Sequence, residues 1–258
     1  MNGFDHVSGK YHDVDDAKIY FEITGNPNGP VLLFLHGGFD NMEDFNSTIT
    51  GFEDYCIIGI DSRGQGKSTL GDQRLSYKLI QKDIEGLLKT LGINKLSIIG
   101  FSDGGIVAYR LAAFSSLEID HIVTIGSRWH YDDALLTKAI FLRITPESWK
   151  AKFPDMYTTY QKLNPEANFE KLTHSVIAMW LDESGSGYPN GQLKEFENPL
   201  MIVRGHNDHL LSLKSVTNLA GLMKNATLLN IPFAGHAAFT DQAEMFKIAL
   251  RQFLDRSE

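Results

Sequence analysis

A serine between two glycines is the feature of the sequence best suited to chemistry. Ser102 stands in the pentapeptide Gly-Phe-Ser-Asp-Gly at 100–104, which follows an apolar, strand-like run at 96–99 and precedes a run with helical character. Where a strand leads directly into a helix, the turn between them is so tight that any side chain in place of Gly100 or Gly104 would collide with the backbone. The hydroxyl is then held at the carboxyl end of the strand, where helix N-terminal amides can stabilise an oxyanion. The pattern predicts a nucleophile for acyl transfer, with a glycine-rich turn without chemistry as the alternative.

A serine hydroxyl needs a base close by to act near neutral pH, and the base needs a third group to orient it. His236 follows the predicted strand 227–231 in Ala-Gly-His, and Asp208 follows the predicted strand 200–203 in a Gly-x-x-Asp loop. Because both loops begin where strands end, we expect them at the same edge of the sheet as Ser102.

Other assignments of these residues stay open. Asp132 or Asp133, which come after the preceding strand, could supply the carboxylate, and Asp208 could simply cap a helix. His206 and His209 flank Asp208 and suggest a metal site, but no cysteine or second ligand cluster accompanies them. We therefore expect no metal and no cofactor.

Strand-like and helical segments alternate along most of the chain. Strands are expected at 10–14, 17–24, 31–35, 56–60, 96–99, 121–125, 200–203 and 227–231. Helices are expected over 75–91, after Ser102, through Val216 and Leu222, and over 240–254. This alternation with long crossovers predicts an α/β fold with a doubly wound, mostly parallel, eight-stranded sheet.

The alternation stops between residues 128 and 198. The segment is typical of several short helices and is rich in aromatic residues, namely Trp129, Phe141, Trp149, Phe153, Tyr157, Tyr160 and Trp180. We expect 128–198 to be a helical cap inserted into a core formed by 1–127 and 199–258. Aromatic residues in such a segment more often pack than contact substrate, so none of them is assigned to the site.

Charge and cysteine content limit the kinds of partner and the compartment that we expect. With 24 basic and 32 acidic residues the net charge is −8, and basic residues do not cluster, so we expect no nucleic acid and no membrane surface as partner. A small uncharged or cationic substrate suits this charge better. The single cysteine, Cys56, cannot form an internal disulfide, and the first residues lack a signal-peptide pattern, which favours a cytoplasmic protein. Whether the protein forms a homodimer stays open.

Four separated motifs together resemble the α/β-hydrolase fold superfamily over nearly the whole chain. They are His-Gly-Gly at 36–38, Asp-x-Arg-Gly-x-Gly-x-Ser at 61–68, the Ser102 turn, and the pair Asp208 and His236. The superfamily has its catalytic triad in this chain order. The resemblance implies that Ser102 is the nucleophile, that His236 is the general base and then acid, and that Asp208 orients the histidine.

The resemblance also implies an oxyanion hole made of backbone amides. One is the N–H of Asp103; the other comes from the His-Gly-Gly-Phe loop, most simply from Gly38, with Phe39 as the alternative. An aspartate after the nucleophile is similar to the turn of valacyclovir-hydrolase-like enzymes, which implies that the Asp103 side chain could bind the amino group of an aminoacyl ester. Alternatively, Asp103 caps the helix or bonds within the protein. Phe39 and the Asp103 side chain are thus our candidates for substrate contact.

These residues lead to one function and two alternatives. The first is a serine hydrolase that cleaves a small carboxylic ester or related acyl compound through an acyl-enzyme. The second is an aminopeptidase, aminoacyl-ester hydrolase or C–C bond hydrolase on the same scaffold. The His-Gly-Gly loop is similar to that of proline iminopeptidases, although their following proline is Phe39 here. The third is a ligand-sensing binding protein with slow turnover, because this fold hosts many activities.

Overall fold

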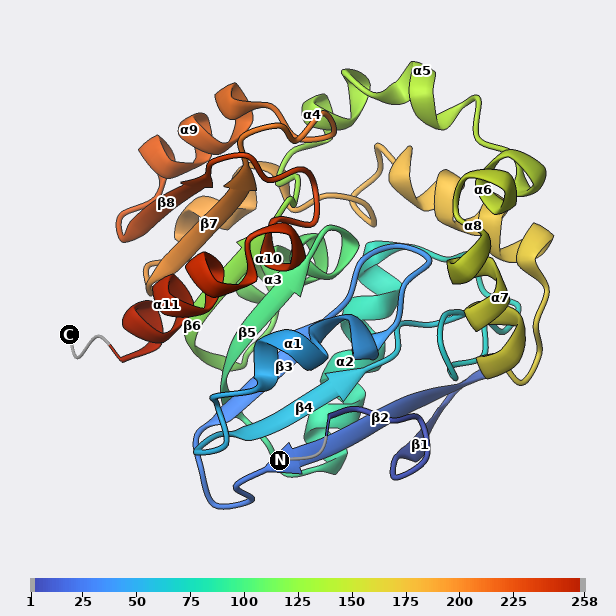
Figure 1. Ribbon diagram of the computed structural model, residues 1–258, viewed down its shortest axis with the longest axis horizontal. Coiled ribbons are helices and arrows are strands. Elements are labelled where there is room, and N and C mark those ends of the chain that lie inside the picture. The colour runs from blue at the N-terminus through green and yellow to red at the C-terminus, as the bar shows by residue number, and fades with distance from the viewer. Residues whose placement is uncertain (1–2, 256–258) are drawn as a thin grey trace.

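A central sheet forms the frame of the molecule (Figure 1). The structure is a computed structural model that describes residues 3–255, and within them eight strands pair in the order β1-β2-β4-β3-β5-β6-β7-β8. The strands are β1 Lys10–Val14, β2 Ala17–Gly25, β3 Val31–Leu35, β4 Cys56–Ile60, β5 Lys95–Phe101, β6 Glu118–Ile125, β7 Leu200–Gly205 and β8 Ala226–Ile231.

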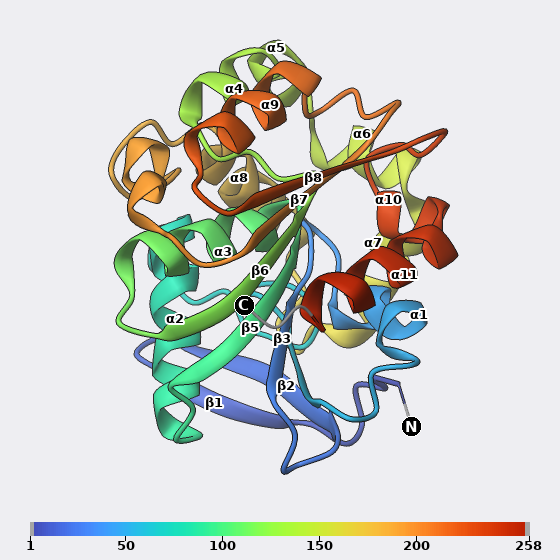
Figure 2. The same cartoon turned by 90° about the vertical axis from the view of Figure 1, so that its left-hand side faces the viewer.

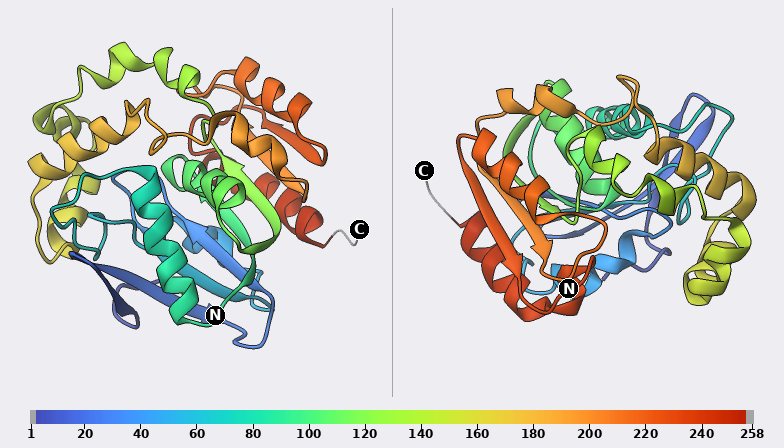
Figure 3. Two further views of the ribbon diagram at one scale, coloured as in Figure 1. Left: turned by 180° about the vertical axis from the view of Figure 1, so that it is seen from behind. Right: turned by 90° about the horizontal axis from the view of Figure 1, so that it is seen from above.

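The sheet is mostly parallel, as predicted. The pairs β1–β2 and β2–β4 are antiparallel, and every neighbouring pair from β4 to β8 is parallel. Figure 3 shows β1 and β8 at opposite ends of the sheet. Because the strands from β4 to β8 run in the same direction, their carboxyl ends meet along one edge of the sheet. The predicted site residues lie at this edge, after β5, β7 and β8.

Helices cover both faces of this sheet (Figure 2). One face packs against α2 Tyr77–Thr90, α3 Asp103–Phe114 and α9 Leu213–Leu222. The other packs against α1 Asn46–Ile49, α10 Ala238–Asp241 and α11 Ala243–Leu254. Among residues 3–255, no helix is both long enough and apolar enough to cross a bilayer.

The continuous apolar run of β3 follows from burial on both faces. Leu33 and Leu35 belong to the core under α2 and α3, whereas Leu32 and Phe34 belong to the core under α1 and α11. Each of the four side chains is at most 1% exposed. Because successive side chains of a strand point to opposite faces, a strand covered on both sides has no polar position.

Short helices fill the segment between β6 and β7, as expected. They are α4 Tyr131–Leu135, α5 Lys138–Phe141, α6 Pro146–Lys152, α7 Pro154–Leu163, α8 Phe169–Trp180 and the 3₁₀-helix η2 Asn190–Glu195. Figure 1 shows this segment arching over the side of the sheet toward which the arrowheads of β5 and β7 point. Its aromatic side chains pack on one another, as in the pair Phe141 and Trp180, whose ring centroids lie 4.7 Å apart.

The predicted helix over 240–254 is present from Ala243 to Leu254 as α11, but its predicted start is wrong. Thr240 and Asp241 belong to the separate helix α10, and the two helices are divided at Gln242, whose φ of −134° and ψ of 55° are not helical. In α10 the Asp241 carboxylate accepts a hydrogen bond of 2.7 Å from the N–H of Gly235. The break allows α10 to pack separately beside the loop that carries His236, a tertiary requirement that the apolar spacing does not encode.

Candidate active site

The turn at Ser102 has the strained geometry that its glycines suggest. Ser102 has φ 49° and ψ −113°, and its N–H donates a hydrogen bond of 2.8 Å to the carbonyl of Ile125 on the neighbouring strand β6. A non-glycine residue in such a conformation costs about 1–3 kcal/mol. A Cβ at Gly104 would lie 2.0 Å from the Leu35 carbonyl oxygen, and one at Gly100 would lie 2.5 Å from that of Gly104. Both glycines are therefore required by close backbone approach.

Ser102, His236 and Asp208 form a continuous chain of hydrogen bonds. Ser102 Oγ lies 3.1 Å from His236 Nε2, and His236 Nδ1 lies 2.9 Å from Asp208 Oδ2. The other carboxylate oxygen, Oδ1, accepts from the N–H groups of Leu210 and Leu211 at 2.8 and 3.1 Å. Burial alone would raise the pKa of Asp208, but the bonds from His236 and from the two amides lower it below its usual value. An ionised carboxylate only accepts, so it holds the histidine proton on Nδ1 and leaves Nε2 to accept from Ser102.

The imidazole of His236 is fixed from two further sides. A Cβ at Gly126, just after β6, would lie 2.9 Å from His236 Cε1, so the ring packs directly on that backbone. On another side the Phe101 ring centroid lies 5.2 Å from that of His236. Gly126 has no distinguishing signal in the sequence, because only the packed structure shows that the His236 ring approaches it.

Of the candidate carboxylates, Asp208 is the one that contacts His236. Asp133 Oδ2 accepts a hydrogen bond of 2.6 Å from Ser215 Oγ, and Asp132 Oδ2 lies 3.5 Å from His130 Nδ1.

The histidines that flank Asp208 do not share its position. His206 and His209 are exposed, whereas Asp208 is buried, and His206 Nδ1 lies 3.4 Å from the Asn230 side-chain amide.

The loop after β3 reaches the Ser102 turn. Its contacts distinguish between Gly38 and Phe39, the two candidates for the second oxyanion amide. The N–H of Phe39 donates to the side-chain carbonyl of Gln65, so that amide is already engaged. Gly38 lies beside the residue that follows the serine, because a Cβ there would lie 2.6 Å from Asp103 Oδ2. The His36 carbonyl accepts from the N–H of Gly104 at 3.0 Å, which joins this loop to α3.

The Asp103 side chain bonds within the protein. Trp180 Nε1 lies 2.9 Å from both carboxylate oxygens, and the Tyr77 hydroxyl donates to Oδ1 at 2.8 Å. Burial raises the pKa of Asp103, and the bonds from Trp180 and Tyr77 and the charge of Arg128 offset part of this rise. Trp180, which the sequence predicted only to pack, thus joins the last residue of α8 to the Ser102 turn through its indole N–H.

The Phe39 ring joins the same loop to the aromatic residues between β6 and β7. It is 3% exposed, and its centroid lies 4.6 Å from that of Trp149 and 5.7 Å from that of Trp180. The ring is therefore packed within the protein, and a contact between Phe39 and substrate stays a prediction.

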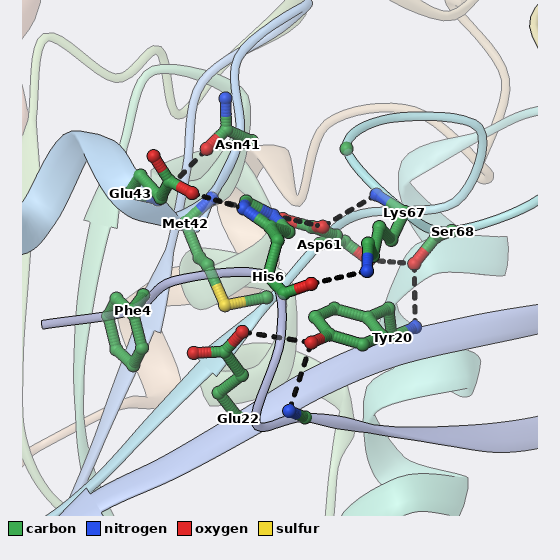
Figure 4. A network of polar contacts seen from close by, with 12 residues as sticks. Phe4, His6, Tyr20, Glu22, Asn41, Met42, Glu43, Asp61, Lys67 and Ser68 are labelled. Atoms are coloured by element: carbon green, nitrogen blue, oxygen red, sulfur yellow. Dashed lines mark hydrogen bonds and ion pairs between the residues drawn. The ribbon is translucent and has the colours of Figure 1, made fainter. Parts of the chain in front are cut away.

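A buried polar network holds the loop after β3 against the turn that begins at Asp61 (Figure 4). His6 lies between two carboxylates, with Nδ1 2.6 Å from Glu43 Oε1 and Nε2 2.8 Å from Asp61 Oδ2. Asp61 also accepts from the N–H groups of Met42 and Lys67 at 3.0 and 2.7 Å. Asp61 opens the Asp-x-Arg-Gly-x-Gly-x-Ser motif, so this motif fixes the loop that carries Gly38.

We expect the free energy of unfolding to fall as the pH rises through the pKa of His6. Burial would lower the pKa of His6, but Asp61 and Glu43 outweigh it and raise the pKa to about 9. Since this lies above the ordinary histidine pKa of 6.5 in the unfolded chain, the stabilisation is complete below pH 6.5 and is lost as the pH rises through 9. The loss amounts to up to roughly 3 kcal/mol. Chemical denaturation of wild type and His6→Gln between pH 6 and 10 measures it, with His174→Gln on the exposed side of α8 as the control. A wild-type advantage over His6→Gln that stays constant with pH contradicts this expectation.

Comparison with known proteins agrees with the fold and shows the family of the chain. The family model of the alpha/beta hydrolase fold matches residues 30–183, and the chain belongs to this family. It is 21% identical to a Haemophilus influenzae protein provisionally assigned as an esterase or lipase, over 92% of this chain and 88% of that protein. It is 24% identical to a proline iminopeptidase of Xylella fastidiosa, over 88% of this chain and 90% of that enzyme. The crystal structure of a hydrolase from Pseudomonas aeruginosa superposes with a TM-score of 0.80 at 18% identity, over 98% of this chain and 100% of that one.

Proposed function

We propose that the protein is a serine hydrolase that cleaves a small carboxylic ester through an acyl-enzyme. The observation that carries this proposal is the hydrogen-bond chain from Ser102 Oγ to His236 at 3.1 Å and from His236 to Asp208 at 2.9 Å. Each member of the chain has the partner that acyl transfer requires: a nucleophile, a base within reach and a carboxylate that orients the base. Membership of the α/β-hydrolase family supports a hydrolase, and the relative assigned as an esterase or lipase favours an ester substrate.

In the acylation step, Ser102 Oγ attacks the ester carbonyl carbon while its proton passes to His236 Nε2. The carboxylate of Asp208 stabilises the imidazolium that forms. The oxyanion accepts hydrogen bonds from the amides of Asp103 and Gly38. The positive end of the α3 helix dipole also stabilises its negative charge. Collapse of the tetrahedral intermediate breaks the bond to the alcohol, and His236 donates the proton to the departing oxygen.

In the deacylation step, water takes the place of the alcohol. His236 accepts a proton from the water as it attacks the acyl carbon, and then returns the proton to Ser102 Oγ as the acid departs. The same two amides hold the second oxyanion. One histidine therefore serves twice as base and twice as acid.

We further propose that residues 128–198 act as the cap and that 1–127 and 199–258 form the catalytic core. The bond from Trp180 to Asp103 supports this division, because it anchors α8 directly on the residue after the nucleophile. The substrate would then bind between the Ser102 turn and the aromatic side chains above it. A largely apolar enclosure would strengthen the hydrogen bonds to the oxyanion.

Pre-steady-state hydrolysis of p-nitrophenyl acetate tests the proposed function. We expect a burst of p-nitrophenolate close to one equivalent per active site, followed by steady turnover. A panel of simple esters, aminoacyl esters and proline amides then gives the preferred bond. A burst without appreciable turnover on any member of the panel would favour the slow binding protein, and the absence of both burst and turnover would refute the hydrolase.

Replacement of Asp103 by asparagine distinguishes an ester hydrolase from an aminoacyl hydrolase. Because Trp180 and Tyr77 already occupy the carboxylate, we expect Asp103→Asn to lower kcat/KM for acetate esters and aminoacyl esters by a similar factor. The measurement is the ratio of the two kcat/KM values in wild type and variant. If Asp103 binds an amine, only the aminoacyl ester should lose, by about tenfold or more for one charge-assisted contact.

A further inference from the structure

Arg128 is a buried arginine next to the proposed catalytic residues. It comes three residues after Ile125, whose carbonyl holds the N–H of Ser102, and two after Gly126, on which the His236 ring packs. The side chain is 8% exposed. A guanidinium carries its charge at any physiological pH, so Arg128 is a permanent buried cation.

The guanidinium uses only part of its hydrogen-bonding capacity. Nη2 donates to Thr137 Oγ1 at 2.9 Å and to the Leu210 carbonyl at 3.0 Å, which places it beside the loop of Asp208. The Phe141 ring centroid lies 4.8 Å from the guanidinium carbon. Nε is buried and has no hydrogen-bond partner among the described residues.

The other buried arginines of the described chain do not share this feature. Arg63, Arg110 and Arg204 are 1, 2 and 8% exposed. In each of them Nε donates a hydrogen bond, to Asp83, to Gln81 and to the Leu211 carbonyl respectively. An unpartnered buried donor is costly, and more so when it is charged, so the Nε of Arg128 is an exception that calls for a partner.

The carboxylates nearest to Arg128 do not supply that partner. The charge of Arg128 acts on Asp103 and Asp133, and it lowers the pKa of each against the effect of burial. Yet Asp103 is bound by Trp180, Asp133 is bound by Ser215, and within residues 3–255 neither lies within ion-pair distance of the guanidinium. The guanidinium therefore has no ion-pair partner among residues 3–255.

We infer that Arg128 binds a carboxylate of the substrate, and that the protein hydrolyses esters that carry a free carboxylate besides the ester group. This inference rests on the proposed function and names its substrate class. The net charge of −8 favours an uncharged or cationic substrate, but surface charges are screened by solvent and salt, whereas the charge of Arg128 is buried. The Phe141 ring packs on the guanidinium, and the Tyr188 hydroxyl, which donates to the Trp180 carbonyl at 2.9 Å, also interacts with Arg128. In such surroundings a bond between a carboxylate and a guanidinium is strong.

The test compares matched esters with and without the carboxylate. The charged probes are monoethyl glutarate, with the carboxylate on the acyl side, and O-butanoylglycolate, with the carboxylate on the alcohol side; the neutral probe is ethyl pentanoate. Wild type should prefer at least one charged probe. In Arg128→Gln the ratio of charged to neutral kcat/KM should fall by about tenfold to a hundredfold, mainly through KM. Arg128→Lys, which keeps the charge, should retain part of the preference.

Arg204→Gln is the matched control. Arg204 is equally buried, and its Nη2 donates to the Asp208 carbonyl at 2.9 Å, but all its nitrogens have protein partners. Its replacement should change both kinds of ester equally and leave the ratio as in wild type. A wild type without preference for the charged probes, or a ratio that Arg128→Gln leaves unchanged, overturns the inference while ester hydrolysis stands.

A binding measurement keeps the inference testable without turnover. Glutarate is titrated calorimetrically into Ser102→Ala and into the double variant that also carries Arg128→Gln, or Arg128→Lys if the glutamine variant does not fold. If glutarate binds to Ser102→Ala and binds at least tenfold more weakly to the double variant, the anion site is supported. This holds even if no ester is cleaved, an outcome in which only the proposed function fails. Absent binding, or equal binding to both, overturns the anion site.

Discussion

Ser102→Ala is expected to fold normally and to lose nearly all ester hydrolysis. The hydroxyl is the attacking group in the proposed mechanism, and removal of a triad serine costs roughly four to six orders of magnitude in kcat. The methyl group of alanine fits where the serine side chain stood, so the melting temperature should change little. The measurement is kcat for p-nitrophenyl acetate together with a thermal melt.

The matched control for this variant is Ser97→Ala. Ser97 lies on the same strand, β5, and is buried, with its Oγ 3.4 Å from His121 Nδ1. Its loss should leave turnover within a few-fold of wild type. A Ser102→Ala variant that retains burst kinetics would show that another group attacks the ester.

Asp208→Asn is expected to be the second most damaging change. An asparagine side chain can donate to His236 Nδ1, which moves the imidazole proton to Nε2 and removes the acceptor that Ser102 needs. In a serine protease with the same triad logic, the corresponding change costs about 10⁴-fold in kcat. The amide oxygen can still accept from Leu210 and Leu211, so we expect only a small change in melting temperature.

Asp133→Asn serves as the control because Asp133 follows the neighbouring strand and bonds to Ser215 instead of His236. We expect a mild effect on kcat. If Asp133→Asn abolishes turnover and Asp208→Asn does not, the orienting carboxylate is Asp133 and the assignment of Asp208 is wrong.

The sheet and the positions that chemistry requires could be predicted because local sequence determines them. A run such as Leu32 to Leu35 has no polar position, which is typical of a strand buried on both faces. Gly100 and Gly104 mark the turn because close backbone approach excludes side chains there. Asp208 and His236 could be placed at one edge because parallel strands end together.

The remaining features depend on contacts between distant segments. Trp180 lies 77 residues from Asp103, and an aromatic-rich sequence does not reveal which indole N–H meets a carboxylate. The bond between His6 and Asp61 spans 55 residues. Gln242 breaks the last helix although the apolar spacing continues, because α10 packs separately beside the His236 loop. Arg128 is an ordinary residue in the sequence, and only its burial and its unpartnered Nε make it notable.

Covalent labelling with a fluorophosphonate, followed by mass spectrometry of the peptides, tests the central claim most directly. The reagent forms a stable adduct with an activated serine, and the peptide that carries it identifies the residue. We predict one adduct per chain, on Ser102, formed at a rate that Asp208→Asn lowers strongly and absent in Ser102→Ala. An adduct on a different residue, or no adduct on a folded wild-type protein, would contradict the assignment of Ser102, His236 and Asp208 as a catalytic triad.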